Sequence, residues 1–282
     1  MKHHNIYPCI WFDNQGKEAA AFYCEVFKDS ELKQCSPMVT TFSIKGKQFM
    51  ALDGGPLYKP NPSISFFVIC ESEEEINDSW NKLSKGGYSL MPLNTYPWSS
   101  RYGWIQDKYG VSWQLSLGKP EQEKPDVFPT LMFTGDQNGN AEKAINFYTS
   151  LFEQSSVDFI SKYEAGEQDT EGNIKHAQFY LNGYRTAAMD SSLPHGFGFN
   201  EGISLVVNCD TQEEIDFYWL NLTEGGKESM CGWCRDVFGV WWQITPSILG
   251  ELMSDPVKAP KVMNAFMKMK KFDIEALKKA GE

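Results

Sequence analysis

The stretch Trp104-Ile-Gln-Asp-Lys-Tyr-Gly-Val-Ser-Trp-Gln114 recurs 129 residues later as Trp233-Cys-Arg-Asp-Val-Phe-Gly-Val-Trp-Trp-Gln243. Both copies carry an Asp-x-x-Gly-Val segment and end on Trp-Gln. The spacing is far longer than the roughly 20–50 residues of a solenoid repeat. The simplest interpretation is two homologous domains in tandem, each of about 120 residues, which is an ordinary domain size.

Further pairs of residues extend this repeat over most of the chain. The matching pairs are Phe22-Tyr23 with Phe147-Tyr148, Ser72-x-x-Glu75 with Thr211-x-x-Glu214, Trp80 with Trp219, and Gly86-Gly87 with Gly225-Gly226. The offset between the copies rises from 121 at Pro8 to 139 at Ile64 and returns to 129 at Gly110. Because insertions are tolerated mainly in surface connections, the gap-free segments between these jumps should be the structural elements.

The composition is that of a chain able to build two ordinary cores. Of 282 residues, 41% are hydrophobic and 14% aromatic, which argues against disorder. The net charge of -11 argues against nucleic acid, because phosphate binding requires clustered Lys and Arg. No apolar run approaches the roughly 20 residues that span a membrane, and the N-terminus lacks a signal peptide's apolar core. The cysteines form no disulfide framework, so we expect a cytoplasmic protein with reduced thiols.

Each copy follows the same predicted order of strands and helices. In the first copy the segments are a strand over 7–12, a helix over 19–27, hairpin strands over 41–44 and 48–52, a strand over 64–69 and a second helix from Ser72. The second copy has Asn182-Gly183 at its hairpin turn. Ser72-x-x-Glu75 and Thr211-x-x-Glu214 predict capping boxes, and the Gly-Gly pairs predict the helix ends. With a final strand pair, the order is β-α-β-β-β-α-β-β, or two βαβββ-like half-modules.

Parts of the second copy resemble a known family. They are the stretch over 199–210, Gln212-Glu-Glu-Ile-Asp216, Tyr218-Trp219 and Cys231-Gly-Trp233. They resemble the vicinal-oxygen-chelate superfamily, which has the glyoxalase I and bleomycin-resistance fold. Within it they resemble the PhnB-like branch, often labelled 3-demethylubiquinone-9 3-methyltransferase. The resemblance covers nearly all of the second copy, and the first copy is a more divergent version.

The resemblance implies an α+β fold of two tandem glyoxalase/bleomycin-resistance-like domains built from βαβββ modules. We place the first domain at 1–119, the second, PhnB-like domain at 126–248, and a helical tail at 249–282. In this superfamily, paired modules curl their sheets into a cup that holds a small molecule. A tandem chain can build within itself the pairing that single-domain relatives reach by dimerising, and a homodimer of the whole chain stays open.

Many members of the superfamily place a divalent metal in the cup. A catalytic metal needs three or four His, Glu, Asp or Cys ligands that converge. The resemblance puts the ligand positions near 7–9, Ala51, Ser63 and Gln114 in the first copy, and near 128–130, Ala188, Gly202 and Gln243 in the second. None of these matches is a His or an acid, and a one-residue shift would add only Glu201. We therefore predict no metal and no other cofactor, with a divalent metal as the alternative.

Six residues are candidates for lining a ligand site: Trp104, Gln114, His176, Glu201, Trp233 and Gln243. The two glutamines lie on otherwise apolar strands, where a buried amide must find a partner. Because side chains alternate along a strand, Gln114 and its neighbour Trp113 cannot both face the cup. Each candidate also has a structural interpretation: core tryptophans, a hydrogen-bonded strand histidine at His176, and a surface acid at Glu201. No catalytic residue is assigned.

Two further motifs favour structural interpretations. Cys231-Gly-Trp-Cys234 lies in a strand and turn context rather than at a helix N-terminus, so we interpret its thiols as structural rather than as redox or zinc groups. Gly196-Phe-Gly198 is the nearest approach to a glycine-rich loop, but it does not lie between a strand and a helix. The residues therefore do not support the methyl transfer that the family label names.

The C-terminal segment is predicted to be amphipathic. Val262, Phe266 and Met269 recur at helical spacing, and Asp273 can cap a short second helix. The segment is short and lacks bulky interfacial aromatics, so it should pack on the chain itself or on a second copy rather than on a membrane.

Three functions stay open. The first is a metal-independent protein that binds a small aromatic or amphiphilic molecule in its cup. The second is an enzyme of the lyase, isomerase or dioxygenase type that holds a divalent metal there. The third is a structural or oligomer-forming paralogue whose cup is filled by side chains.

Overall fold

The chain folds into four βαβββ modules followed by three helices. The structure, a computed structural model, describes residues 6–118 and 126–282. Module 1 contains β1 (Ile6–Phe12), α1 (Gly16–Val26), β2 (Glu31–Cys35), β3 (Val39–Ile44) and β4 (Lys47–Asp53). Module 2 contains β5 (Ile64–Cys70), α2 (Glu73–Leu83), β6 (Tyr88–Tyr96), β7 (Ser99–Gln106) and β8 (Ser112–Leu117).

The second repeat supplies the other two modules and the tail. Module 3 contains β9 (Asp126–Thr134), the 3-10 helix η1 (Gly135–Gln137), α3 (Ala141–Leu151), β10 (Ser156–Lys162), β11 (Ile174–Leu181) and β12 (Tyr184–Ser191). Module 4 contains β13 (Ile203–Cys209), α4 (Gln212–Thr223), β14 (Lys227–Glu228), β15 (Trp233–Arg235) and β16 (Trp241–Pro246). The tail contains α5 (Leu249–Ser254), α6 (Ala259–Phe266) and α7 (Ile274–Ala280).

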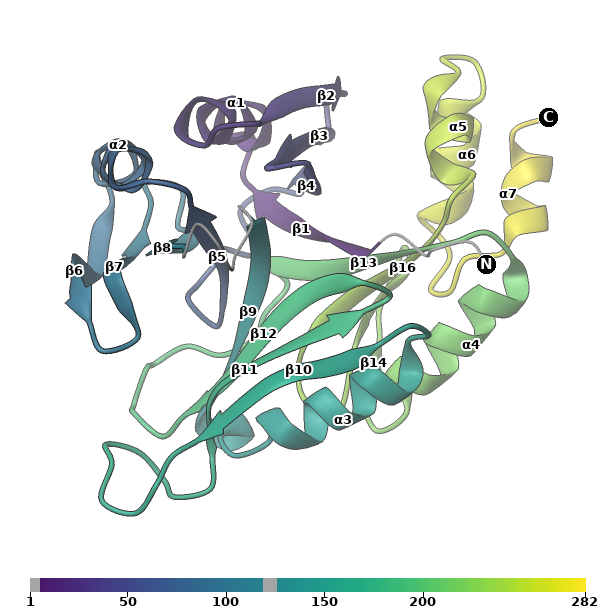
Figure 1. Ribbon diagram of the computed structural model, residues 1–282. Coiled ribbons are helices and arrows are strands. Elements are labelled where there is room, and N and C mark those ends of the chain that lie inside the picture. The colour runs from purple at the N-terminus through teal and green to yellow at the C-terminus, as the bar shows by residue number, and fades with distance from the viewer. Residues whose placement is uncertain (1–5, 119–125) are drawn as a thin grey trace.

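The four modules form two eight-stranded sheets that exchange halves between the repeats (Figure 1). Sheet A has the order β14-β15-β16-β13-β1-β4-β3-β2, and sheet B has the order β10-β11-β12-β9-β5-β8-β7-β6. The joints are the antiparallel pairs β1 with β13 and β5 with β9. Each sheet thus unites one module from each repeat, and the pairing predicted for a tandem chain forms within one molecule.

The predicted strands and helices are present, and each module has one strand more than the β-α-β-β-β-α-β-β order gave. The additional strands include β2, whose residues are all exposed, and β10, which exposes Val157, Phe159 and Ile160. A strand without a buried face leaves no alternating apolar pattern, so the sequence does not reveal it. The alternative reading as two βαβββ half-modules per repeat is the correct one.

The second helix of each repeat begins at the predicted cap, but the two caps differ. In α4 the Thr211 side chain and the Glu214 carboxylate form a complete capping box. In α2 the Ser72 hydroxyl accepts from the Glu75 N–H, whereas the Glu75 carboxylate binds Lys45 at 2.6 Å. Both members of this ion pair are 2% exposed, so Glu75 ties α2 to the β3–β4 hairpin instead of closing a box.

The repeated Asp-x-x-Gly-Val motif is a buried turn beneath the helices. Asp107 accepts hydrogen bonds from the backbone of Tyr109 and Val111 and from Trp113 Nε1 at 2.8 Å. Asp236 makes the equivalent bonds in the second repeat. Burial raises the pKa of both carboxyls to about 6. The most repeated stretch of the chain therefore fixes the main core, where Trp113 and its counterpart are fully buried.

The tail packs on the second repeat (Figure 1), which is one of the two arrangements, packing on the chain itself or on a second copy, that its sequence pattern left open. The carbonyls of Met269 and Lys270 accept from the Cys231 and Gly232 N–H groups, each at 2.7 Å. Asp273 caps α7 through the Ala276 N–H at 2.9 Å. Within the described residues, no helix is both long and apolar enough to cross a membrane.

Candidate functional site

Each sheet has one face that carries the main core with the helices and a second face that is free of them. Alternation along the strands assigns residues to the second face, which we call cup face A on sheet A and cup face B on sheet B. Each holds a small apolar cluster separate from the main core. In cup face A this cluster is Tyr7, Cys9 and Val206, with Met50 and Leu52 packed against it. In cup face B it is Ile69, Phe128 and Ala187, with Phe67.

Both sheets curl around these faces. The ring centroids of Trp11 on β1 and Trp233 on β15 are 5.8 Å apart, although β13 and β16 lie between those strands. Phe67 on β5 and His176 on β11 are likewise three strands apart and 6.4 Å from each other. Strands three positions apart in a flat sheet are separated by about 14 Å. Curvature brings the side chains together, as in the predicted cups.

The floor of cup face A is a polar cluster around Gln243. Gln243 Nε2 donates to Ser204 Oγ at 2.9 Å, and both side chains hydrogen-bond with the Cys9 thiol. Burial raises the pKa of Cys9 to about 12, so this thiol stays protonated near neutral pH. The cluster is internally satisfied and carries no charge.

One end of cup face A carries aromatic rings and a carboxylate. Trp11 lies between Tyr58, at 5.1 Å, and Trp233. Burial, followed by the nearby Glu201 carboxylate, raises the pKa of Tyr58. Trp241 continues the row, 6.4 Å from Trp233.

The floor of cup face B has the same glutamine with different partners. Gln114 Nε2 donates to Ser65 Oγ at 2.8 Å, and the Tyr102 hydroxyl donates to Gln114 Oε1 at 2.6 Å. Thr130 takes the position that Cys9 has in cup face A, directly opposite Ser65 on the neighbouring strand. Its hydroxyl is fully buried and has no hydrogen-bond partner. Such a group loses the solvation of its oxygen without compensation.

A chain of polar side chains crosses the rest of cup face B. His176 Nε2 lies 3.0 Å from Gln178 Nε2, and Gln178 Oε1 accepts from Arg185. The guanidinium of Arg185 stands 4.4 Å above the ring of Phe128 and 3.7 Å from an Asp126 carboxylate oxygen. Burial, assisted by Arg185, lowers the pKa of His176 to about 4. His176 is therefore neutral at physiological pH.

The six candidate residues divide between the two cups. Glu201, Trp233 and Gln243 belong to cup A, and Trp104, Gln114 and His176 belong to cup B. Trp104 Nε1 donates to Ser112 Oγ at 2.9 Å on this face. The strand argument is confirmed, since Gln114 faces the cup while Trp113 lies in the main core.

Sequence reasoning missed several cup residues, above all Cys9, Trp11, Thr130 and Arg185. The first three lie on β1 and β9, which open the repeats and pair with the other repeat's strands. Their alternation with core residues along the strand could have assigned them to the second face of the sheet. It could not have identified the neighbouring strands whose side chains share that face.

The ligand positions that the family resemblance gave can be located on the two sheets. Gln114 and Gln243 face the cups, and the ranges 7–9 and 128–130 each include cup-facing residues. Ala51 and Ala188 face the main core, and the cup positions are instead taken by residues such as Met50, Ala187, Ser65 and Ser204. The cup floors offer mainly thioether, hydroxyl and amide groups and a protonated thiol, whereas the imidazole of His176 and the carboxylates of Asp126 and Glu201 do not form one cluster of ligands. Residues 6–118 and 126–282 contain no group of three His, Cys, Asp or Glu side chains able to hold a metal ion.

The remaining motifs stay outside the cups. Cys234 lies in the main core, and Cys231 approaches Met267 of the tail at 3.8 Å. Burial raises the pKa of both thiols, which disfavours the reactive thiolate. The loop over 196–198 connects β12 with β13, two strands, as its sequence context indicated.

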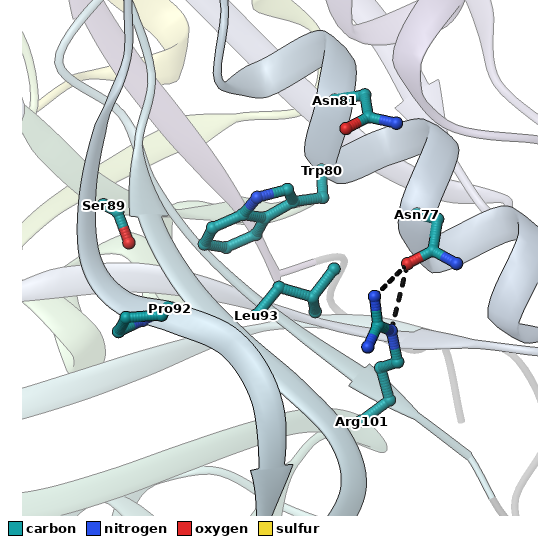
Figure 2. Close-up of a pocket in the computed structure, with 7 residues that line it drawn as sticks. All are labelled: Asn77, Trp80, Asn81, Ser89, Pro92, Leu93 and Arg101. Atoms are coloured by element: carbon teal, nitrogen blue, oxygen red, sulfur yellow. Dashed lines mark hydrogen bonds between the residues drawn. The ribbon is translucent and has the colours of Figure 1, made fainter.

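A separate hollow of about 620 Å³ opens between α2 and the β6–β7 hairpin (Figure 2). Trp80 and Leu93 form its apolar floor, and Arg101 binds Asn77 at its edge. In the second repeat the tail fills the matching place. An added Cβ at Gly103 would meet Trp80 and Leu93, and one at the matching Gly232 would meet Phe272 of the tail. The hollow is thus open in the first repeat, whereas the tail covers the matching place in the second repeat. It lies at the edge of the sheet, away from both cups.

Comparison with known proteins identifies the family. The family described as 3-demethylubiquinone-9 3-methyltransferase matches residues 4–116 and again 125–245. The PhnB protein from Bacillus cereus is 38% identical over 39% of this chain and 96% of its own, with a TM-score of 0.38. A Staphylococcus aureus protein is 31% identical over 42% of this chain and 100% of its own, with a TM-score of 0.20.

A third structure spans nearly the whole chain. Glyoxalase I from Zea mays is 13% identical over 90% of this chain and 98% of its own, with a TM-score of 0.57, which indicates a shared fold. No curated protein matches the chain. Since the two family matches together cover most of the sequence, the chain belongs to the 3-demethylubiquinone-9 3-methyltransferase family, in tandem, on a glyoxalase-like fold.

Proposed function

We propose that the protein binds a small organic molecule on cup face B without a metal ion. The observation that carries this proposal is the Thr130 hydroxyl, which is fully buried and unpartnered in the middle of the face. A buried hydroxyl without a partner is costly, and a ligand that donates to it or accepts from it removes that cost.

The surroundings of Thr130 define the chemistry of the ligand. Phe67 and Phe128 stack at 5.3 Å beside it, and exposed aromatic rings flank the face, Trp98 against Tyr102 and Phe159 against His176. These walls suit a flat apolar body, and Thr130 suits one hydroxyl or carbonyl group on it. The ligand class is thus aromatic or amphiphilic.

The alternatives meet specific obstacles in the structure. A metal-dependent lyase, isomerase or dioxygenase needs a set of acidic or imidazole ligands, and neither cup floor supplies one. Methyl transfer, which the family description names, needs a site for a methyl donor, and the loop over 196–198 does not precede a helix. A cup filled by side chains is favoured by the Phe67–Phe128 stack and by the burial of Thr130 and its cup-face neighbours, but it leaves the Thr130 hydroxyl without a hydrogen-bond partner.

The first experiment is native mass spectrometry of the protein purified without chelator or affinity-tag metal. We expect a metal-free mass, with or without an organic adduct that would identify the ligand class. A mass excess equal to one or two divalent ions would contradict the metal-free proposal.

The second experiment compares two matched variants with 2-naphthol as a flat probe that carries one hydroxyl. Thr130→Val should bind it about three- to tenfold more weakly than the unmodified protein, the range of one hydrogen bond. Thr186→Val is the control, because its hydroxyl is also fully buried and unpartnered but lies on the core face. Calorimetric titration with and without EDTA gives the affinities. Equal affinities for both variants, or no binding at all, would refute a site at Thr130.

A further inference from the structure

The aromatic end of cup face A consists of rings packed edge to face, of which Trp233 and Trp241 are buried and Trp11 and Tyr58 are partly exposed. The Trp11 ring stands at 85° to Tyr58 and at 73° to Trp233, and Trp241 stands at 61° to Trp233. Rings set nearly perpendicular to one another form adjoining walls, whereas stacked rings form a single layer. We call Trp11, Tyr58, Trp233, Trp241 and Glu201 the aromatic corner.

The backbone holds the Trp11 wall in place. Trp11 Nε1 donates to the Gly55 carbonyl at 2.7 Å, which fixes the orientation of the ring. The ring lies directly against Gly54, where an added Cβ would stand 2.2 Å from Trp11 Cζ2. A wall fixed in this way loses little freedom when a ligand binds.

Electrostatics at the corner favour a positive ligand. The faces of tryptophan and tyrosine rings are negative, and the Glu201 carboxylate acts on Tyr58 beside them. Among the described residues, Glu201 forms no ion pair with a Lys, Arg or His side chain, and Arg235, which lies opposite Trp241 on the same face of the sheet, is exposed to solvent. The chain as a whole carries a net charge of -11, which adds to the attraction.

We propose that the aromatic corner binds an organic cation of the quaternary-ammonium type. The methyl groups of such a cation contact the ring faces, and Glu201 neutralises its charge from the side. Cup B has no equivalent, because Met132, Ser112 and Pro62 stand at the positions of Trp11, Trp241 and Glu201. The site is separate from the one proposed at Thr130, so either can fail without the other.

The test is calorimetric titration of the whole protein with choline and with 3,3-dimethyl-1-butanol, which has the same shape but no charge. We expect choline to bind and its neutral analogue to bind at least about tenfold more weakly, because only the cation gains from the ring faces and the carboxylate. Equal binding of both compounds would overturn the proposal in favour of a merely apolar surface. Binding of neither would mean that the rings fill the corner.

Variants locate the site. Trp11→Leu should weaken choline binding about tenfold, and Trp11→Phe, which keeps a ring, should restore part of it. Glu201→Gln should weaken binding about threefold and reduce its dependence on salt, since the lost attraction is screened by ions. Trp104→Leu is the control, because Trp104 is the cup B counterpart of Trp233. If the control loses as much affinity as Trp11→Leu, the cation binds elsewhere.

Discussion

The two cups occupy matching positions on the same fold but differ in nearly every side chain that could meet a ligand. On the core side the repeats are equivalent, with Asp107 and Asp236 making the same bonds to backbone and to a buried tryptophan. On the cup side only the glutamine, one serine and one tryptophan recur. The residues that decide the fold are thus structural, and any difference in ligand binding between the cups must come from positions where the two copies differ.

The largest expected effect is the dependence of stability on pH that His176 causes in cup B. Cup A has Val39 at the matching position, and valine does not titrate. In the folded protein His176 has a pKa of about 4, whereas an unfolded histidine has its ordinary value of about 6.5. As pH falls from 6.5 towards 4, the unfolded chain takes up a proton that the native protein refuses. The contribution of His176 to the free energy of unfolding should therefore fall by about 2–3 kcal/mol down to pH 4.5.

His176→Gln should abolish this loss, as measured by urea unfolding at pH 7 and pH 4.5. The raised pKa values of Asp107 and Asp236 act in the opposite direction between about 6 and 3.8, but they are common to both proteins and cancel in the difference. His195→Gln is the control, since the pKa of His195 is lowered less severely at a more exposed position. An unchanged acid sensitivity in His176→Gln would show that His176 is not held neutral by its cup.

The second expected effect concerns cup A, where Gly54 supports Trp11. Gly54→Ala must displace the Trp11 ring and break its bond to Gly55, at a cost of about 1–3 kcal/mol in the free energy of unfolding. Gly198→Ala, at a loop glycine with open space around it, is the control and should stay within about 0.5 kcal/mol. Denaturant unfolding followed by tryptophan fluorescence measures both. Equal stabilities would mean that Trp11 is free to move, and the aromatic corner would lose its fixed wall.

Much of this architecture could be predicted from sequence because core packing leaves periodic patterns. Local rules are enough to predict the helices, the Thr211 capping box and the turns at Asp107 and Asp236. The alternation of side chains along a strand likewise predicts that Trp113 and Gln114 point to opposite faces of the sheet. The exchange of modules between sheets was expected only through the resemblance, since strand partners distant in sequence leave no local pattern.

The ligand-facing details were beyond prediction for a related reason. Trp11 and Trp233 meet only because sheet A curls, and curvature depends on the packing of all eight strands. The lack of a partner for the Thr130 hydroxyl is likewise a property of the assembled face. Each cup combines one module from each repeat. The sequence could therefore name the six candidates without showing that three of them belong to each cup.

The smallest expected effect tests whether the shared glutamines are equivalent. Gln114→Ala removes the acceptor of the buried Tyr102 hydroxyl and should cost about 1–3 kcal/mol, the penalty of an unsatisfied buried group. Gln243→Ala leaves only the Cys9 thiol and Ser204, and because a thiol is a weak hydrogen-bonding group the cost should be about 1 kcal/mol less. Urea unfolding of the two variants at pH 7 gives the difference. If Gln243→Ala instead loses more stability than Gln114→Ala, the Cys9 cluster is the more tightly organised floor. Cup A then becomes the better candidate for the principal ligand.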